Sequence, residues 1–303
     1  MKTLIVCSKN SGKIAPFILD QAESLKAQGI EIEFFTVSSK GLRGYLKSRK
    51  GLLQIINDFQ PNIIHAHYGL SGLLANLQRK IPVITTYHGS DINNKKVLKF
   101  SKIAIFLSKF NIFVSQKNIE IAKPKKNYDL IPCGIDFDIF KPLDKEKCRA
   151  KFGFTNDEKL VLFSSSFDNQ VKNSELAHSA VNLLPNVKLI ELKGYTREQV
   201  CELMNAADAV LMTSRTEGSP QFIKEAMACN CPIISVNVGD VESVIADTEN
   251  CFVCAYNAEE IAENLQKIII ANTRTTGRNK VLNFDNKKVA KKIIDIYKKI
   301  ISR

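Results

Sequence analysis

The feature that most constrains this fold is a regular alternation of short apolar segments with longer amphipathic ones. In the first half of the chain, strand-length apolar segments occur at 4–7, 31–37, 62–67 and 82–86, with shorter candidates at 111–115 and 129–131. Residues with helical spacing fill the intervals, at 16–28, 45–59 and 69–79. Strands separated by helices predict a parallel sheet with right-handed crossovers, and so an α/β domain.

The alternation stops once and then resumes. Pro and Gly interrupt regular structure at 131–136 and again at 140–142. Beyond this break, strands are expected at 160–165, 187–192, 209–213, 232–236 and 252–254, and helices at 173–184, 197–206, 220–228 and 258–271. We therefore expect two Rossmann-like domains, 1–135 and 136–285, facing across a cleft, with a basic amphipathic helix in 286–303 packing back towards the first. Ligands bind at the carboxyl ends of strands in such sheets.

The excess of positive over negative charge lies in the first half of the chain. The net charge is +12, and residues 1–135 hold 20 basic residues against 8 acidic ones, a surplus of 12. The densest parts are 40–50 and 95–126. This surplus fits either a solvated surface or attraction to anionic membrane lipid or an anionic acceptor. Nucleic acid is disfavoured as a partner, because no recognised binding motif accompanies the charge.

The cellular location follows from two expectations about the apolar segments. The apolar run at the start of the chain is shorter than that of a secretory signal and fits a buried strand. No segment approaches the roughly 20 apolar residues of a membrane-spanning helix. A cytoplasmic protein is expected, peripheral at the inner face of the membrane at most.

Four of the eight cysteines have a spacing that could suggest zinc, namely Cys229, Cys231, Cys251 and Cys254. The alternative is that they are small buried residues around two strands, with reduced thiols. We favour the buried alternative, because Cys231 opens an apolar strand.

The segment with the clearest chemistry follows the strand at 209–213. Ser219 is a good N-cap and Pro220 suits the first helical position, so a helix is expected to begin here. The N–H groups of Gln221 and Phe222 would then form an anion site at the positive end of the helix. Two carboxylates, Glu217 and Glu225, flank this end of the helix. They would not favour an anion, but they can accept hydrogen bonds from hydroxyl groups. We expect Glu217 to hold a sugar and Glu225 a ribose.

A set of motifs links this segment to a known family. They are HAHYG at 65–69, TYHGSD at 86–91, IPCGID at 131–136, KGY at 193–195 and MNAADAVLMTSRTEGSP at 204–220. Together with Glu217 and Glu225, which form a Glu-x7-Glu signature, they resemble the retaining glycosyltransferases of family 4, the glycosyl transferases group 1. The similarity runs from about residue 62 to residue 253. It implies the GT-B fold, a nucleotide-sugar donor and no metal requirement.

The resemblance also implies roles for single residues. His88 matches a histidine near the reacting carbon and the 6-position of the sugar. Lys172 matches the lysine that neutralises the donor pyrophosphate, and Gly12 matches a glycine that lets the backbone approach the phosphate and the acceptor. The loop with Gly194 and Tyr195 would lie by the nucleotide base.

The loop with Gly218 would contact the donor. A trio of His65, His67 and His88 could be read as a metal site. We prefer His67 as an acceptor-side residue and His65 as a core histidine, because no carboxylate motif accompanies the trio.

The sequence departs from the family in two places. Related enzymes carry an arginine seven residues before the lysine, whereas this chain has the stretch 164–167 with no basic residue. The pyrophosphate charge would then rest on Lys172, the helix end at 220 and Arg215. Glu-Gly-Ser-Pro at 217–220 replaces the commoner Glu-Gly-Phe-Gly, which indicates an unusual sugar pocket.

The expected reaction moves a sugar, with retention, from a nucleoside-diphosphate sugar to a hydroxyl of a saccharide or lipid-linked acceptor, in surface polysaccharide or glycolipid synthesis. One alternative is a nucleotide-sugar epimerase of the same fold. Another is a non-catalytic nucleotide-sugar-binding subunit, prompted by the absent arginine. A nicotinamide-dependent enzyme is disfavoured because no G-x-G-x-x-G follows the first strand.

Overall fold

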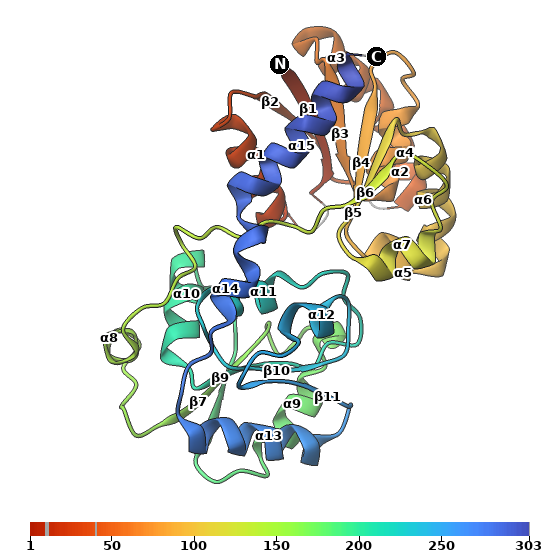
Figure 1. Cartoon of the computed structure of the whole chain (residues 1–303). Coiled ribbons are helices and arrows are strands. Elements are labelled where there is room, and N and C mark those ends of the chain that lie inside the picture. Colours follow the sequence, from red (N-terminus) through yellow and green to blue (C-terminus); the bar gives the residue numbers. More distant parts are fainter. Residues whose placement is uncertain (10–11, 40, 303) are drawn as a thin grey trace. The chain divides into compact units, whose positions relative to one another are not determined.

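The chain forms two compact units, seen in a computed structural model that describes residues 1–9, 12–39 and 41–302 (Figure 1). Unit 1 comprises Met1–Gly134 together with Asn286–Arg303, and unit 2 comprises Ile135–Asp285. Each unit has its own parallel sheet, as the alternating pattern predicts. No helix among the described residues is both long enough and apolar enough to cross a membrane.

The sheet of unit 1 has the strand order β2-β1-β3-β4-β5-β6, and every neighbouring pair is parallel. Its strands are β1 (Lys2–Ser8), β2 (Glu31–Val37), β3 (Ile63–His67), β4 (Val83–Tyr87), β5 (Phe110–Phe113) and β6 (Tyr128–Leu130). In register, Ile5 of β1 lies between Phe34 of β2 and His65 of β3. The central strands are buried on both faces, as expected where helices cover both sides of a parallel sheet.

Eight helices of unit 1 are described: α1 (Pro16–Lys26), α2 (Gly41–Lys47), α3 (Arg49–Phe59), α4 (Gly69–Asn76), α5 (Ser90–Asn93), α6 (Lys95–Leu107), α7 (Gln116–Ala122) and α15 (Asn286–Ile301). The prediction of one helix over 45–59 was wrong, because the segment divides at Ser48. The Ser48 hydroxyl donates to the carbonyl of Gly44, a bond that bends or ends helices.

Helix α15 completes the core of unit 1 beside α1 (Figure 1). Its apolar face buries Val289, Ile293 and Tyr297 with Leu25 of α1 and Ile63 of β3. The lysines of α15 lie on the opposite face. The apolar face of α15 therefore packs on the sheet of unit 1, although all of unit 2 lies between them in the sequence.

Small residues bring α4 close to its neighbours. A Cβ at Gly69 would lie 2.0 Å from the hydroxyl of Ser101 in α6, and one at Gly72 would lie 2.6 Å from the side chain of Thr85 in β4. Both distances are shorter than any real contact, so larger residues would force α4 away from β4 and α6. This packing fixes the face that α6 presents outward.

The sheet of unit 2 has the order β11-β10-β9-β7-β8, and all neighbours are again parallel. Its strands are β7 (Lys159–Phe163), β8 (Val187–Ile190), β9 (Ala209–Met212), β10 (Ile233–Val236) and β11 (Cys251–Cys254). Its helices are α8 (Lys145–Lys151), α9 (Ser174–Val181), α10 (Arg197–Ala206), α11 (Gln221–Ala228), α12 (Val241–Ile245), α13 (Ala258–Ala271) and α14 (Gly277–Val281). Short 3-10 helices form at Gln170–Lys172 and Leu282–Phe284.

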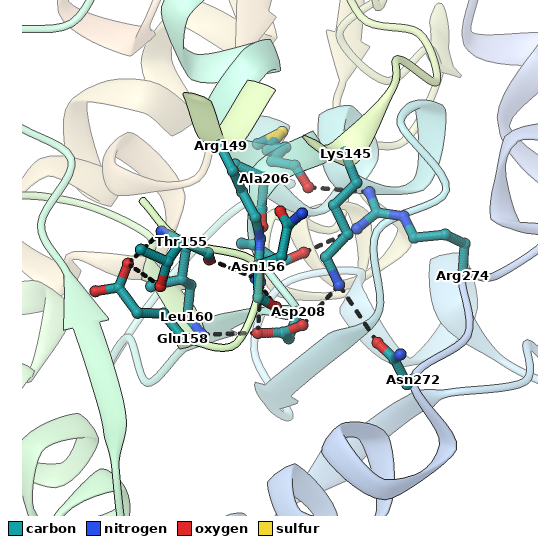
Figure 2. Close-up of polar contacts among 12 residues, drawn as sticks. Lys145, Arg149, Thr155, Asn156, Glu158, Leu160, Ala206, Asp208, Asn272 and Arg274 are labelled. Carbon is teal, nitrogen blue, oxygen red and sulfur yellow. Dashed lines mark hydrogen bonds and ion pairs between the residues drawn. The ribbon is translucent and has the colours of Figure 1, made fainter. Parts of the chain in front are cut away.

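A buried ionic cluster holds the amino ends of the unit 2 strands (Figure 2). The Asp208 carboxylate, just before β9, accepts from Arg149 at 3.0 Å, from Lys145 at 2.7 Å and from the backbone N–H of Leu160 at 2.7 Å. Arg149 is also bonded to the carbonyl of Ala206, at the end of α10. The cluster joins α8, α10, β7 and β9, and a cation is favourable at the negative end of a helix.

Of the four cysteines with the zinc-like spacing, Cys229, Cys231 and Cys254 are buried and Cys251 is partly buried. Cys229 and Cys231 are fully buried, and the sulfur of Cys229 lies 3.8 Å from that of Cys201. Over the described ranges, no three His, Cys, Asp or Glu side chains are grouped so as to hold a metal ion.

Candidate functional site

The central feature of unit 2 is an ion pair between two predicted site residues. Glu217 lies in the loop after β9, and Lys172 ends the 3-10 helix after β7, so both lie at the carboxyl end of the sheet. The Lys172 Nζ donates to Glu217 Oε1 at 2.7 Å, and both side chains are largely buried. Partial burial strengthens such a pair relative to one on the surface. The structure thus brings together a cation and a carboxylate that are 45 residues apart.

The start of α11 differs from the prediction. The helix begins at Gln221, and Pro220 occupies the N-cap with φ −68° and ψ 117°, so Ser219 is not the cap and Pro220 is not the first helical residue. The Ser219 hydroxyl donates instead to Asp240 Oδ2 at 2.6 Å. The proposed anion site keeps its position, because Gln221 and Phe222 are the first two residues of the helix.

Lys224 is a site residue that the sequence reasoning missed. Its side chain is fully buried in α11, with Nζ hydrogen-bonded to the Ser219 hydroxyl and 3.5 Å from Asp240 Oδ2. The ring of Phe284 lies 5.1 Å below the ammonium group. A buried lysine must be paired, so Lys224 and Asp240 hold the loop before α11 against the loop after β10. The signal available in the sequence was one basic residue directly after the apolar pair Phe222 and Ile223 of this helix.

The same two loops approach each other through glycines. A Cβ at Gly239 would lie 2.8 Å from the carbonyl oxygen of Gly218, and Gly239 has φ +60°. Only glycine fits this position without moving the backbone. The loop of Gly218, which was predicted to contact the donor, is therefore packed tightly against the loop that carries Gly239 and Asp240.

Glu225 faces a cation on another helix. Arg197 Nη2 lies 3.7 Å from Glu225 Oε1, and the guanidinium lies 5.1 Å over the ring of Phe140. Both charged side chains are mostly buried. Arg197, the first residue of α10, had no predicted role.

A cavity of about 590 Å³ is lined by the residues that flank Lys172 in sequence and by Thr216, the residue before Glu217. Its wall includes Val171, Asn173, Arg215 and Thr216. The Arg215 guanidinium donates to Asn173 Oδ1 at 3.0 Å, and its backbone N–H donates to the carbonyl of Val171 at 2.8 Å. Arg215 is thus anchored at the wall of the cavity, where it could contribute positive charge.

The loop predicted to lie by the nucleotide base is tied to the loop after β7. Lys193 Nζ donates to Asp168 Oδ2 at 2.8 Å, and Gly194 has φ +82°. The half-exposed ring of Tyr195 meets Phe152 edge to face at 6.0 Å between centroids.

Three histidines line the carboxyl ends of β3 and β4 in unit 1. His65 is fully buried, with Nδ1 2.6 Å from the Tyr297 hydroxyl and Nε2 2.7 Å from the Thr86 hydroxyl. His67 Nδ1 lies 3.0 Å from His88 Nε2. Within the described chain, His67 Nε2 is buried and has no hydrogen-bond partner. His65 is therefore a core histidine, and His67 is buried with one ring nitrogen unpartnered among the described residues.

Burial keeps these imidazoles neutral. It lowers the pKa of His65 and His88 to about 3 and lowers the pKa of His67 well below its ordinary value, and the neighbouring histidines add to the effect on His67 and His88. His88 is enclosed by the rings of Phe17 and Tyr68, at 4.7 and 4.8 Å between centroids. Both ring nitrogens of His88 have partners, Nε2 with His67 and Nδ1 with the sulfur of Cys133 at 3.6 Å, and the neutral ring is unsuited to pairing with phosphate as a cation.

Asp91, the last residue of the TYHGSD motif, positions this loop and was also missed. One carboxylate oxygen accepts from the N–H groups of His88 and Gly89 at 3.1 and 3.0 Å, and the other accepts from Gly69 at 2.9 Å. Asp91 therefore joins the loop after β4 to the start of α4. Burial raises its pKa to about 6, although the backbone hydrogen bonds act in the opposite direction.

A cavity of about 440 Å³ opens next to this loop in unit 1. Its wall includes Ser8, Lys13, Tyr68, Asp91 and Asn94. Tyr68, the residue before α4, has φ +74°, which is a strained conformation for a bulky residue and is typical of functional sites.

Gly12 lies in the loop after β1 with φ +86°, a conformation that glycine adopts without strain. Its backbone N–H donates to the carbonyl of Lys9 at 2.9 Å. A side chain here would meet open space, so the backbone conformation is what requires glycine.

Comparison with known families matches both units. Residues 157–270 match the family described as glycosyl transferases group 1, and residues 9–119 match the family described as glycosyl transferase 4-like.

Among curated relatives, the chain is 26% identical over 240 residues to a glycosyltransferase assigned to teichuronic acid biosynthesis, TuaC of Bacillus subtilis, covering 69% of this chain and 62% of that protein. It is 24% identical over 261 residues to the D-inositol 3-phosphate glycosyltransferase of Mycobacteroides abscessus, covering 69% of this chain and 58% of that protein. The alignments thus take in about three fifths of the length of these relatives.

Solved structures share the fold. A sucrose-phosphate synthase from Thermosynechococcus elongatus superposes with a TM-score of 0.87 at 18% identity, covering 100% of both chains. A glycosyltransferase from Rickettsia africae gives 0.80 at 19% identity, covering 100% of this chain and 99% of the other. Anabaena HepE in complex with UDP gives 0.78 at 18% identity, covering 99% of this chain and 100% of the other. These neighbours confirm the GT-B fold class that the motifs predicted.

Proposed function

Because this chain belongs to the glycosyl transferases of group 1, we propose that it moves a sugar, with retention, from a nucleoside-diphosphate sugar to a hydroxyl of a saccharide or lipid-linked acceptor. The observation that carries the proposal is the Lys172–Glu217 pair beside the amino end of α11. A cation, a carboxylate and a helix N-terminus at one place can bind the two parts of such a donor. The phosphates match the cation and the helix end, and the sugar hydroxyls match the carboxylate.

The bond changes of the proposed reaction balance without an added reagent. The bond between the anomeric carbon and the phosphate oxygen breaks, and a bond from the same carbon to the acceptor oxygen forms on the same face. The acceptor proton passes to the leaving phosphate oxygen. Lys172, Arg215 and the N–H groups at 221 and 222 stabilise the charge that develops on this phosphate. We expect no metal to be required.

The donor that we favour carries uridine. Anabaena HepE, which shares the fold, has been crystallised with UDP, with UDP and glucose, and with UDP-glucose. The loop of Gly194 and Tyr195 would receive the base, and Glu225 the ribose. The likeness to TuaC supports surface polysaccharide synthesis as the setting, with a cytoplasmic enzyme peripheral at the membrane.

A screen of UDP-, GDP- and ADP-sugars by thermal shift tests the donor assignment. A bound donor raises the melting temperature by mass action, and the Glu225→Ala variant should lose most of that rise. Nuclear magnetic resonance of the product should show the anomeric configuration of the donor retained. Inversion would contradict the proposed reaction, and a rise with none of the donors would contradict the donor site.

The second candidate is a non-catalytic nucleotide-sugar-binding subunit. The observation that favours it is the stretch Ser164–Phe167, which offers no basic side chain near Lys172. Donor binding without turnover, with turnover appearing once a partner protein is added, would select this candidate. Interconversion of the donor sugar without an acceptor would instead indicate an epimerase.

A further inference from the structure

Helix α6 carries a stripe of exposed residues that its own unit does not use. The α6 stripe consists of Lys95, Lys99, Lys102, Ile103 and Phe106, all exposed. Residues spaced by 4, 7, 8 and 11 positions lie on one side of a helix, because an α-helix has about 3.6 residues per turn. Phe106 is 86% exposed, more than any other large apolar residue described, and Ile103 is 47% exposed.

The opposite side of α6 fixes the orientation of the stripe. Ser101 and Ala104 are fully buried, and α6 packs against α4, where Gly69 approaches Ser101 closely. The Ser101 hydroxyl donates to the carbonyl of Asp91 at 2.8 Å. The helix therefore cannot rotate to bury Phe106 without breaking this contact.

The charge of the stripe has one sign. No acidic residue occurs between Asp91 and Glu120, while this segment contains six lysines. In the described ranges, none of the three lysines of the stripe forms an ion pair. A one-signed surface of this kind attracts an anionic partner and repels a cationic one.

An aromatic side chain among lysines fits an anionic bilayer better than other anionic partners. In a bilayer interface the apolar ring enters the acyl boundary, while lysine stems lie along it and their ammonium groups stay at the headgroups. The phosphates of a nucleic acid would pair with the lysines, but a duplex would leave Ile103 and Phe106 without an apolar partner. Only unpaired bases could stack on the Phe106 ring. The combination of charge and apolar exposure therefore favours lipid.

We propose that the α6 stripe docks this protein on an anionic membrane surface and that the unit 1 cavity receives the head group of a lipid-linked acceptor there. The first residues of α6 also form part of the cavity wall, namely Asn94, its N-cap, and Val97. Val97 and Phe106 are nine residues apart, or about 14 Å along the helix. The two residues lie on opposite sides of α6, because nine residues make about two and a half turns, so the head group would pass around the helix to the cavity while its lipid stays in the bilayer. The acceptor part of this inference rests on the proposed function.

Flotation of the full chain with lipid vesicles tests the docking surface. We expect it to float with equimolar phosphatidylcholine and phosphatidylglycerol and to remain at the bottom with phosphatidylcholine alone. Phe106→Ser and the double variant Lys99→Ser, Lys102→Ser should each lower the partition coefficient about tenfold, since each removes one component of the interaction.

Ile270→Ser provides the matched control. Ile270 is 73% exposed on α13 of unit 2 and has no lysine stripe around it, so its loss should leave flotation unchanged. Flotation of Phe106→Ser equal to wild type would overturn the inference, as would failure of the wild type to float. Retention of the wild type on single-stranded DNA in place of anionic vesicles would overturn it too.

A separate readout distinguishes this inference from the proposed function. Donor-induced thermal stabilisation depends on unit 2, so Phe106→Ser should retain it fully. Transfer to a lipid-linked acceptor in vesicles should fall with flotation, whereas transfer to the same saccharide without lipid should not. If the α6 stripe variants bind the donor normally and float like the wild type, only the proposed docking surface is wrong. If flotation depends on the stripe but the wild type binds no donor, only the proposed function is wrong.

Discussion

Lys172 Nζ and Glu217 Oε1 are 2.7 Å apart, so the cation and the carboxylate at the centre of unit 2 are each other's partners. A donor that uses Lys172 for its phosphate and Glu217 for its sugar must therefore separate or share the pair. In the proposed function, the pair is a preformed donor site whose own charges are neutralised until the donor enters.

Replacing Glu217 by Gln should separate binding from turnover. The variant keeps the shape of the side chain but releases Lys172 from its carboxylate, so affinity for the nucleoside diphosphate should stay level or rise. Turnover should fall by about 10²- to 10³-fold if the carboxylate acts on the transition state. Calorimetric titration with UDP beside a transfer assay measures both quantities, and Glu263→Gln, on the exposed surface of α13, is the control. Unchanged turnover would refute the role of Glu217.

Replacing Lys224 by Met should destabilise unit 2. The change removes the ammonium group and leaves Asp240, mostly buried, with the Ser219 hydroxyl as its remaining partner in this cluster. Loss of one partner of a buried pair costs about 3 kcal/mol.

The double variant Lys224→Met, Asp240→Asn should recover about half of the loss, because the uncompensated charge is gone. Denaturant unfolding of the wild type and both variants measures these differences. If the single and double variants were equally destabilised, the pair would not be the source of the effect.

Acidification should lower the stability of unit 1 below about pH 6.5. The pKa values of His65 and His88 fall to about 3 in the folded chain, and that of His67 is also strongly lowered. The unfolded chain therefore binds more protons below the ordinary histidine pKa of about 6.5, and the stabilisation is lost as the pH falls. Asp91 acts in the opposite direction, since its raised pKa of about 6 favours the folded state on acidification, but it is one group against three.

Melting temperatures measured between about pH 7 and about pH 5 test this dependence. His88→Asn should flatten the fall in melting temperature, whereas replacing the exposed His178 of unit 2 in the same way should not. A melting temperature that is constant over this range would contradict the neutral, buried state of the three histidines.

Tyr297→Phe should loosen α15 from unit 1. The change removes the hydroxyl that lies 2.6 Å from His65 Nδ1 and leaves a buried ring nitrogen without a partner. The cost should be about 1–3 kcal/mol of unfolding free energy. Hydrogen exchange of the α15 amides measures it locally, and Tyr128→Phe, on a half-exposed tyrosine, serves as the control. Equal exchange in wild type and Tyr297→Phe would show that the apolar face alone holds the helix.

The sequence predicted the parts of the fold that depend on local pattern. Strand positions, the parallel sheets and the helices α10 and α13 follow from periodicity and are confirmed. Features that depend on distant residues were missed. Ser219 is of a residue type that often caps helices, but its hydroxyl donates to Asp240, which lies in the loop after β10. Ser48 divides a helix through a hydrogen bond that periodicity does not report.

The candidate site shows the same division. The segment after β9 indicated Glu217 and Glu225, the family resemblance implied Lys172 and His88, and the structure pairs Lys172 with Glu217. Lys224 and Asp91 were missed because their roles depend on contacts with distant parts of the chain. Lys224 pairs with Asp240, and Asp91 accepts a hydrogen bond from the N–H of Gly69. The roles of the motif residues in catalysis stay predictions for the experiments above.

Helix α15 also sets an order on the synthesis of the protein. Unit 1 consists of Met1–Gly134 and Asn286–Arg303, so on the ribosome its first sheet emerges well before the helix that covers it. Until α15 arrives, Ile63 and Ile84 lack their apolar cover and His65 lacks the Tyr297 hydroxyl. All of unit 2 is made in that interval and has every strand it needs. The nascent chain should therefore complete its second unit before its first.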